Sequence, residues 1–405
     1  MMKKLLVGEV ITPFRAFKPG GILVDEGYIL AVDHVDALKR EAAQILDFGD
    51  AYILPGFVDI HVHGGGGNDT MDATPEAICN VARTHARGGT TTLFPTTLTA
   101  PMKDIKHALL AVQEVSKRNP REFEGARIPG AHVEGPYFNP EQAGAQNPEY
   151  LKVPDINEFM DLIESVKIVR RVSLAPELPG ALELIKVLND KGIIVSIGHS
   201  NARYEEVLKA VEVGATHVTH IFSGMSSLRR IKSYRIPGVL ESALLLDSLT
   251  VEIIADGHHL PPSLIKLVLK CKSLGSVCGV TDAMSAAGMG RGEYTLGGLK
   301  VIVENDVVDE YEVKPRGCVA KLENREAFAG SVAFMNEMLH YLVESVGLSI
   351  SDAAQLLSFN PAKIMKIDHM VGVLASGRLA DIVVLDENFD VVATFVGSEE
   401  IFGTV

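Results

Sequence analysis

A repeated alternation of short apolar segments with amphipathic segments limits the folds open to this chain more than any other feature. The apolar segments are rich in β-branched residues, and the segments between them repeat their apolar residues at helical spacing. Such alternation is typical of βα units around a parallel sheet. We predict strands over residues 57–62, 90–94, 128–134, 171–175, 193–198, 216–221, 250–255 and 276–281. We predict helices over residues 75–87, 102–118, 181–190, 202–213 and 263–272.

Eight such strands can close into a (β/α)8 barrel or lie in a doubly wound open sheet. Polar residues capable of chemistry stand at the C-terminal end of strand after strand. A barrel brings all these ends to one mouth, whereas an open sheet would spread them along an edge. The chain is therefore predicted to be an α/β protein built on a (β/α)8 TIM-type barrel.

The two ends of the chain depart from this alternation. Residues 1–55 and 371–405 both carry short strand signals separated by turns, with glycine turns at Gly372 and Gly377 in the second segment. We expect the two ends to pair as one small β-sandwich domain flanking the barrel. The predicted domains are residues 1–55 plus 365–405 for the β domain and residues 56–364 for the barrel.

Composition and charge exclude several classes of protein. The chain has 405 residues, of which 38 are basic and 52 acidic, and a net charge of −14 disfavours nucleic-acid binding. No apolar run reaches the roughly 18 residues of a membrane span, and Glu9 interrupts the N-terminal apolar stretch before it could form a signal peptide. The four cysteines form no C-x-x-C pair and are typical of reduced thiols. We predict a cytoplasmic protein without nucleic-acid or membrane partners.

His61 and His63 close the first predicted strand. Because they are two residues apart, both side chains face the same side of that strand and can reach one ion. For an isolated pair, two surface histidines before a glycine loop would be the usual interpretation. Five other predicted strands also end in histidine or a carboxylate, namely at Glu134, His199, His220, Asp256 and Asp282. Nitrogen and oxygen ligands without a thiolate favour Zn²⁺, Fe²⁺, Mn²⁺ or Co²⁺.

The order of these motifs resembles the amidohydrolase superfamily, and within it the N-acetylglucosamine-6-phosphate deacetylase family. The motifs extend from about residue 50 to residue 385, and they are specific together although each is weak alone. The matching segments are Pro55-Gly56-Phe57-Val58-Asp59, His61-Val62-His63, His132-Val133-Glu134-Gly135-Pro136, Gly198-His199-Ser200, Thr219-His220, Thr281-Asp282-Ala283 and Gly377-Arg378-Leu379-Ala380-Asp381.

The resemblance implies a divalent transition metal site of one or two ions. Zinc is the preferred metal, with iron, manganese and cobalt as alternatives. Glu134, His199 and His220 would hold the primary ion. His61 and His63 would hold a second ion, with Glu134 bridging the two and Asp282 close to both.

A metal-activated water needs a group that accepts its proton and delivers it to the departing amine, and we assign this role to Asp282. His259 is expected to bind substrate and to stabilise the oxyanion. The resemblance also implies substrate contacts at Ser223 and Gly224, and a phosphate contact at Arg235 within Arg235-Ile236-Pro237-Gly238.

Two positions depart from the family pattern, and both concern substrate recognition. Ser223 stands where the family usually has an asparagine, and Gln146 stands where a phosphate-contacting histidine is expected. The predicted reaction is hydrolysis of N-acetylglucosamine 6-phosphate to glucosamine 6-phosphate and acetate. N-acetylgalactosamine 6-phosphate and an unphosphorylated amino sugar are alternatives. Relatives of this kind suggest a homodimer.

Two other interpretations compete with the metal enzyme. A serine esterase could use Ser200 as nucleophile with Asp282 and His340, beside the glycine-rich loop that follows His63. A barrel that has lost its ligands could serve as a binding scaffold, although every expected ligand position is retained here. Among the remaining histidines, we expect His217, three residues before His220, to face outward from the barrel.

Overall fold

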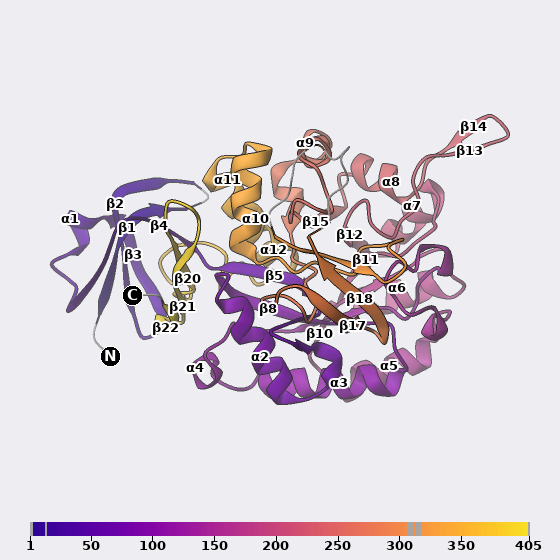
Figure 1. Ribbon diagram of the computed structural model, residues 1–405, viewed down its shortest axis with the longest axis horizontal. Coiled ribbons are helices and arrows are strands. Elements are labelled where there is room, and N and C mark those ends of the chain that lie inside the picture. The colour runs from indigo at the N-terminus through magenta and orange to yellow at the C-terminus, as the bar shows by residue number, and fades with distance from the viewer. Residues whose placement is uncertain (1–2, 13, 306–311, 313–316, 404–405) are drawn as a thin grey trace.

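The computed structural model describes residues 3–12, 14–305, 312 and 317–403. Its centre is a parallel sheet of eight strands that curls into a barrel, which confirms the predicted fold class (Figure 1). An isolated parallel bridge between Val62 and Ala283 joins the first strand to the segment after the last. In sheet order the strands are β5 (Phe57–Val62), β8 (Thr90–Thr97), β9 (Ala131–Glu134), β10 (Val169–Leu174), β11 (Ile194–Ile197), β12 (Ala215–Val218), β15 (Thr250–Ile253) and β16 (Val277–Gly279).

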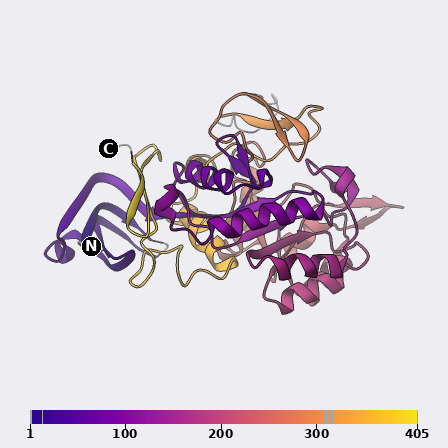
Figure 2. The same ribbon diagram turned by 90° about the horizontal axis from the view of Figure 1, so that it is seen from below.

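Helices cover the outside of this barrel, as Figures 1 and 2 show. Their apolar faces pack against the outer faces of the strands in one large core. Local signals set their ends: the Thr74 side chain accepts a hydrogen bond from the Ala77 backbone N–H at the start of the first large helix, which has Pro75 in its first turn. The main helices are α2 (Pro75–Ala86), α3 (Met102–Val115), α5 (Ile156–Ser165), α6 (Ala181–Asp190), α7 (Tyr204–Glu212), α8 (Val239–Leu245), α9 (Pro262–Cys271) and α10 (Met335–Tyr341).

Both ends of the chain enter one seven-stranded sheet beside the barrel (Figure 1). The antiparallel pairing of β4 with β20 joins the N-terminal strands to the C-terminal ones. Backbone hydrogen bonds from Ile29 N–H to the Arg378 carbonyl and from Ala380 N–H to the Gly27 carbonyl join the β2–β3 edge of the sheet to the segment before β20. The N-terminal and C-terminal strands therefore share one hydrophobic core. The sheet order is β22 (Glu399–Gly403), β21 (Val391–Val396), β20 (Ile382–Leu385), β4 (Gln44–Pro55), β1 (Lys4–Ile11), β2 (Ala16–Asp25) and β3 (Tyr28–His34). The exact domain boundaries at residues 55/56 and 364/365 stay a prediction.

Two insertions at the barrel were not predicted. A hairpin of β13 (Arg229–Ile231) and β14 (Tyr234–Ile236) projects away from the body of the molecule (Figure 1). A three-stranded antiparallel sheet of β17 (Gly292–Leu296), β18 (Leu299–Glu304) and β19 (Val319–Leu322) follows the last barrel strand. Its apolar residues pack with Leu98 and Met284 in a separate core cluster, so this sheet walls one side of the barrel mouth. Within the described residues, no helix is both long and apolar enough to cross a membrane.

Candidate metal centre and active site

The predicted ligands meet at the C-terminal mouth of the barrel. β5 carries His61 and β9 ends in Glu134, while His63, His199, His220 and Asp282 follow the ends of β5, β11, β12 and β16. These last three residues adopt positive φ angles of 45°, 26° and 47°. Non-glycine residues rarely adopt such angles, and they concentrate at functional sites because surrounding structure must hold them there. The local backbone therefore turns out of each strand just where its ligand is needed.

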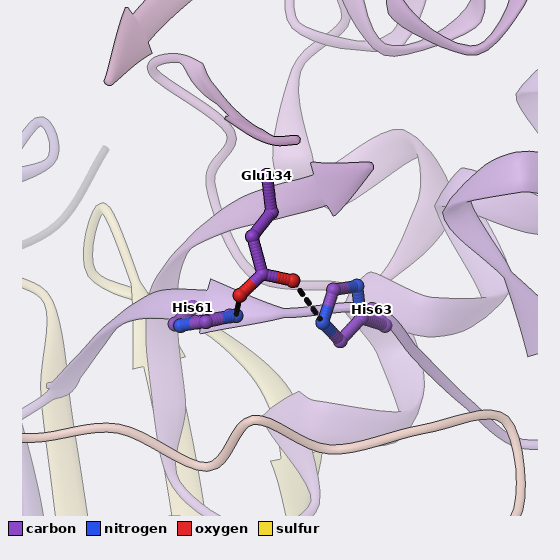
Figure 3. A group of neighbouring side chains, drawn as sticks. All are labelled: His61, His63 and Glu134. Carbon is purple, nitrogen blue, oxygen red and sulfur yellow. Dashed lines mark ion pairs between the residues drawn. The ribbon is translucent and has the colours of Figure 1, made fainter. Parts of the chain in front are cut away.

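Glu134 stands at the centre of this group. One carboxylate oxygen lies 3.4 Å from His61 Nε2 and the other lies 3.3 Å from His63 Nε2, an arrangement that Figure 3 shows. The first oxygen also lies 3.5 Å from His199 Nε2 and 3.2 Å from His220 Nε2. The ligand atoms form two sets, each within 4.8 Å, that share the Glu134 carboxylate: one with His61 and His63, and the other with His199 and His220.

Asp282 approaches the same cluster from the end of the last strand. Its Oδ1 lies 3.4 Å from His61 Nε2 and 3.2 Å from His63 Nε2. All six side chains are buried. The structure therefore brings every predicted metal ligand into one cluster, centred on Glu134.

The second nitrogen of each of the four imidazoles is held by an oxygen that can only accept. His61 Nδ1 lies 3.2 Å from Glu252 Oε2, and the other three Nδ1 atoms lie 3.2, 2.8 and 3.2 Å from the carbonyl oxygens of Thr96, Gln142 and Ser223. Each Nδ1 must therefore donate, so in the neutral rings the lone pair stands on Nε2, which faces the shared centre. His61 Nε2 is buried there without a hydrogen-bond partner. This donor set fits a divalent transition metal.

The charges of the cluster agree with that fit. Burial opposes ionisation of Glu134, but the surrounding imidazoles, His61 foremost, hold its pKa well below the usual range. Burial likewise opposes ionisation of Asp282, and His61 and His63 nevertheless lower its pKa. The surroundings of both carboxylates thus favour the ionised form, which is the form that binds a divalent cation.

A second pair, Asp256 and His259, stands beside this centre. Asp256 Oδ1 accepts the backbone N–H groups of His258 and His259 at 2.9 and 2.8 Å, and its Oδ2 lies 2.7 Å from His259 Nδ1. Burial disfavours the charged imidazole, but the Asp256 carboxylate outweighs it and raises the pKa of His259. The ring is thus oriented and biased towards a protonated donor.

The cavity at the mouth has a volume of about 220 Å³. Apolar side chains form part of its wall, including Leu98, Leu296 and Phe328. Among the described residues that line it there is no lysine or arginine. The predicted residues that line it are His63, Glu134, Gln146, His199, His220, Ser223, Gly224, His259 and Asp282. A Cβ on Gly224 would come within 2.8 Å of His199 Nδ1, so only glycine allows this loop to lie against the ligand.

Two of the predicted substrate contacts, Gln146 and Arg235, have protein partners that the sequence did not indicate. The Gln146 amide donates to Glu134 Oε2 at 2.6 Å, and its oxygen accepts the Thr99 backbone N–H at 2.9 Å, so this side chain orients a predicted ligand while it lines the cavity. Arg235 is exposed on β14, outside the cavity lining, and its guanidinium donates to the Ser233 carbonyl. The hairpin that carries it projects away from the body of the molecule, as Figure 1 shows, and no sequence signal indicated this hairpin.

The triad of the serine esterase alternative is not assembled. Ser200 is buried, and its hydroxyl donates to Glu177 Oε2 at 2.7 Å rather than to an imidazole. His340 packs edge-on against Phe389 and lines a different cavity. Ser200 instead fixes the loop that carries His199.

Sequence reasoning missed two charged residues inside the barrel, Arg171 and Glu252. Both are fully buried and form a short ion pair beneath the ligand cluster. The available signal was a charge within an otherwise apolar strand, because such a charge needs a partner where both faces of the strand are buried. The prediction for His217 was wrong: it is buried, and its Nε2 lies 3.4 Å from Glu252. His220 lies beyond the end of β12 at positive φ, so strand alternation does not relate the two histidines.

Comparisons with known proteins agree with this site. The model of the amidohydrolase family matches residues 52–402. An N-acetylglucosamine-6-phosphate deacetylase of Vibrio furnissii is 34% identical over 388 residues, which cover 94% of this chain and 90% of that protein. An N-acetylgalactosamine-6-phosphate deacetylase of Escherichia coli O157:H7 is 33% identical over 384 residues, which cover 95% of this chain and 96% of that protein.

Among solved structures, a mutant N-acetyl-D-glucosamine-6-phosphate deacetylase of Mycobacterium smegmatis, in complex with N-acetyl-D-glucosamine-6-phosphate, has a TM-score of 0.86 and 30% identity to this chain. The superposition covers 99% of this chain and 100% of that one. The family that the motifs indicated is thereby confirmed, and the chain belongs to the amidohydrolase family.

Proposed function

We propose that this chain is a metal-dependent deacetylase that hydrolyses N-acetylglucosamine 6-phosphate to glucosamine 6-phosphate and acetate. The observation that carries the proposal is the convergence of four imidazoles and two carboxylates in one buried cluster at the floor of the cavity that His259 also lines. The names and coverage of the relatives support the same reaction class.

The metal ligands would divide into two sets. Glu134, His199 and His220 would hold the primary ion, and His61, His63 and Glu134 would hold a second, with zinc as the proposed metal at both. A divalent ion bound there supplies Lewis acidity, which lowers the pKa of a water molecule and polarises the acetamide carbonyl. Two filled positions are proposed because the His61–His63 pair converges on the bridging carboxylate instead of facing solvent.

The chain's own groups then move the proton. Asp282 accepts a proton as the water oxygen attacks the acetamide carbon, and it returns that proton to the nitrogen as the C–N bond breaks. His259 donates from Nε2 to the carbonyl oxygen as negative charge develops, while Asp256 holds the ring from the other side. The apolar wall at Leu98 and Leu296 limits access of bulk water to the reacting groups.

The substrate is less constrained than the reaction. Relatives that act on the two epimeric sugars are 34% and 33% identical to this chain, so identity does not distinguish the epimers. No described lysine or arginine lines the cavity. If Arg235 binds the 6-phosphate, a second copy of the chain must supply it, because within one chain it lies outside the cavity.

We therefore propose a homodimer. Leu228, Ile231 and Tyr234 expose 58%, 43% and 75% of their surface near or on the hairpin, and apolar groups that lie so open favour burial against a partner. We also propose a cytoplasmic location, which the free state of all four cysteines supports.

The test is acetate release from a panel of N-acetylhexosamines with and without a 6-phosphate, using protein of measured metal content. We expect turnover of a phosphorylated N-acetylhexosamine, its loss after chelation and its return with zinc. Fully metal-loaded protein that releases no acetate from any member of the panel would contradict the proposal. Acetate release that survives chelation but is lost in Ser200→Ala would instead support the serine esterase hypothesis.

A further inference from the structure

The interior of the barrel holds a charged layer where layers of bulky apolar side chains are usual. Arg171 on β10 and Glu252 on β15 form an ion pair there, and both side chains are fully buried. The arginine also donates to the hydroxyls of Ser196 and Thr219 and to the Ile60 carbonyl. The guanidinium thus contacts residues of several strands, and its ion pair with Glu252 orients that carboxylate.

The other side of Glu252 faces the ligand cluster. Its Oε2 accepts from His61 Nδ1 at 3.2 Å and from the His220 backbone N–H at 3.0 Å. His61 is the only one of the four imidazole ligands whose Nδ1 is held by a side chain; carbonyl oxygens hold the others. The orientation of the His220 ring depends on the Ser223 carbonyl and not on Glu252.

We propose that Glu252, fixed by Arg171, is a positioning residue that sets the tautomer of His61 and thereby determines whether the second metal position is filled. This inference rests on the proposed function and deepens it. A carboxylate at this place requires His61 to carry its proton on Nδ1, so Nε2 keeps the lone pair that an ion needs.

Glu252→Gln tests this dependence because an amide has one acceptor oxygen in place of two. Because Arg171 can only donate, the single oxygen of the glutamine amide should accept from the Arg171 guanidinium. The NH₂ group of that amide then faces His61. Nδ1 of His61 must then accept, and the proton moves to Nε2, where it blocks the ion. The backbone N–H of His220 loses its acceptor at the same place, but the His220 ring keeps the Ser223 carbonyl, so the larger loss of affinity should fall on the second position.

The double variant Arg171→Met/Glu252→Gln gives the opposite expectation. Without the guanidinium, the glutamine oxygen can turn to His61 and its NH₂ group can face His217 Nε2, which lies next to the present Oε1. The buried positive and negative charges are removed together, so no unpaired charge remains in the barrel. A purely structural role for the ion pair also predicts recovery here, so the two accounts differ in Glu252→Gln itself: a structural role lowers zinc affinity at both positions alike, whereas the tautomer of His61 lowers it mainly at the second.

The experiment measures zinc bound per chain by elemental analysis after dialysis at a series of free zinc concentrations. We expect two ions in the wild type, one in Glu252→Gln with affinity at the second position lowered about 10- to 100-fold, and two again in the double variant. Asp381→Asn is the matched control, since it removes another buried carboxylate paired with an arginine, Arg127, outside the cluster. It should keep both ions.

Unchanged zinc affinity in Glu252→Gln, affinity lowered at both positions alike, or a double variant that stays at one ion, would overturn the inference. Should Glu252→Gln fail to fold, Glu252→Asp keeps the charge opposite Arg171 but shortens the reach to His61, and it must show the same selective loss. Zinc counts are read whether or not acetate is released, so failure of the proposed deacetylase reaction is seen separately from failure of this positioning role.

Discussion

Asp256→Asn isolates the contribution of charge at His259. The present carboxylate accepts two backbone N–H groups on Oδ1 and the His259 ring on Oδ2. Asparagine offers one oxygen, which the two backbone donors will hold at the Oδ1 place, so its NH₂ group faces His259 Nδ1. The ring then accepts at Nδ1 and keeps a proton on Nε2, but it loses the carboxylate that raises its pKa and becomes neutral.

The magnitude follows from comparing a charged donor with a neutral one. A net hydrogen bond contributes about 1 kcal/mol when neutral and about 1.5–3 kcal/mol when charged. Loss of the charge should therefore cost about 1–2 kcal/mol of transition-state stabilisation, or roughly a 5- to 30-fold fall in kcat. Removal of the whole donor in His259→Ala should cost about 10²- to 10³-fold.

A double-mutant cycle separates this account from a general structural effect. Acetate release is measured for Asp256→Asn, His259→Ala and the combined variant at equal metal content. If Asp256 acts only through His259, the combined variant will be no slower than His259→Ala. An equal additional loss in the His259→Ala background, or a wild-type kcat in Asp256→Asn, would refute the reasoning.

Three further predictions follow from the same structure. Asp282→Asn should lower kcat about 10²- to 10⁴-fold in metal-loaded protein because proton transfer is lost, and a near wild-type rate of acetate release would remove its assigned role. Arg235→Ala should raise KM for the 6-phosphorylated sugar much more than for the unphosphorylated one; equal effects in steady-state kinetics would exclude a phosphate contact. Burial lowers the pKa of His85 to about 4. Between pH 6.5 and 4, His85 is therefore protonated in the unfolded chain but neutral in the folded chain. Stability should therefore fall as the pH drops through this window, by up to about 3 kcal/mol, and denaturant unfolding of His85→Gln at pH 7 and pH 4.5 should show a smaller fall. If the free energy of unfolding of His85→Gln fell with pH as much as that of the wild type, His85 would not be the group responsible.

The barrel and its ligands could be read from local features. A strand buried on both faces leaves a continuous apolar run, and a helix on the outside leaves a period near 3.6, so each element shows its type within a few residues. The ligands stand at strand ends, and the C-terminal ends of barrel strands share one mouth. His61 and Glu134 could therefore be assigned to one site although 72 positions of sequence separate them.

Contacts inside and around the barrel could not be predicted in this way. Arg171 and Glu252 each look like an isolated charge in a strand, and only closure of the barrel makes them partners. The inward direction of His217 depends on where β12 ends and on the irregular backbone at His220. Gln146 matched a family position by alignment of motifs, but its amide is engaged by Glu134 and Thr99.

The sequence by itself determined the succession of strands and helices, the residue types at the barrel mouth and the family to which they belong, because these depend on short stretches of chain. Tertiary structure alone decided which atoms meet: the shared position of Glu134 between two sets of histidines, the hydrogen bond that orients His61, and the place of Arg235 outside its own cavity. The physical reason is that side-chain direction and proton position are set by neighbours distant in the chain, which come into contact only when the barrel closes.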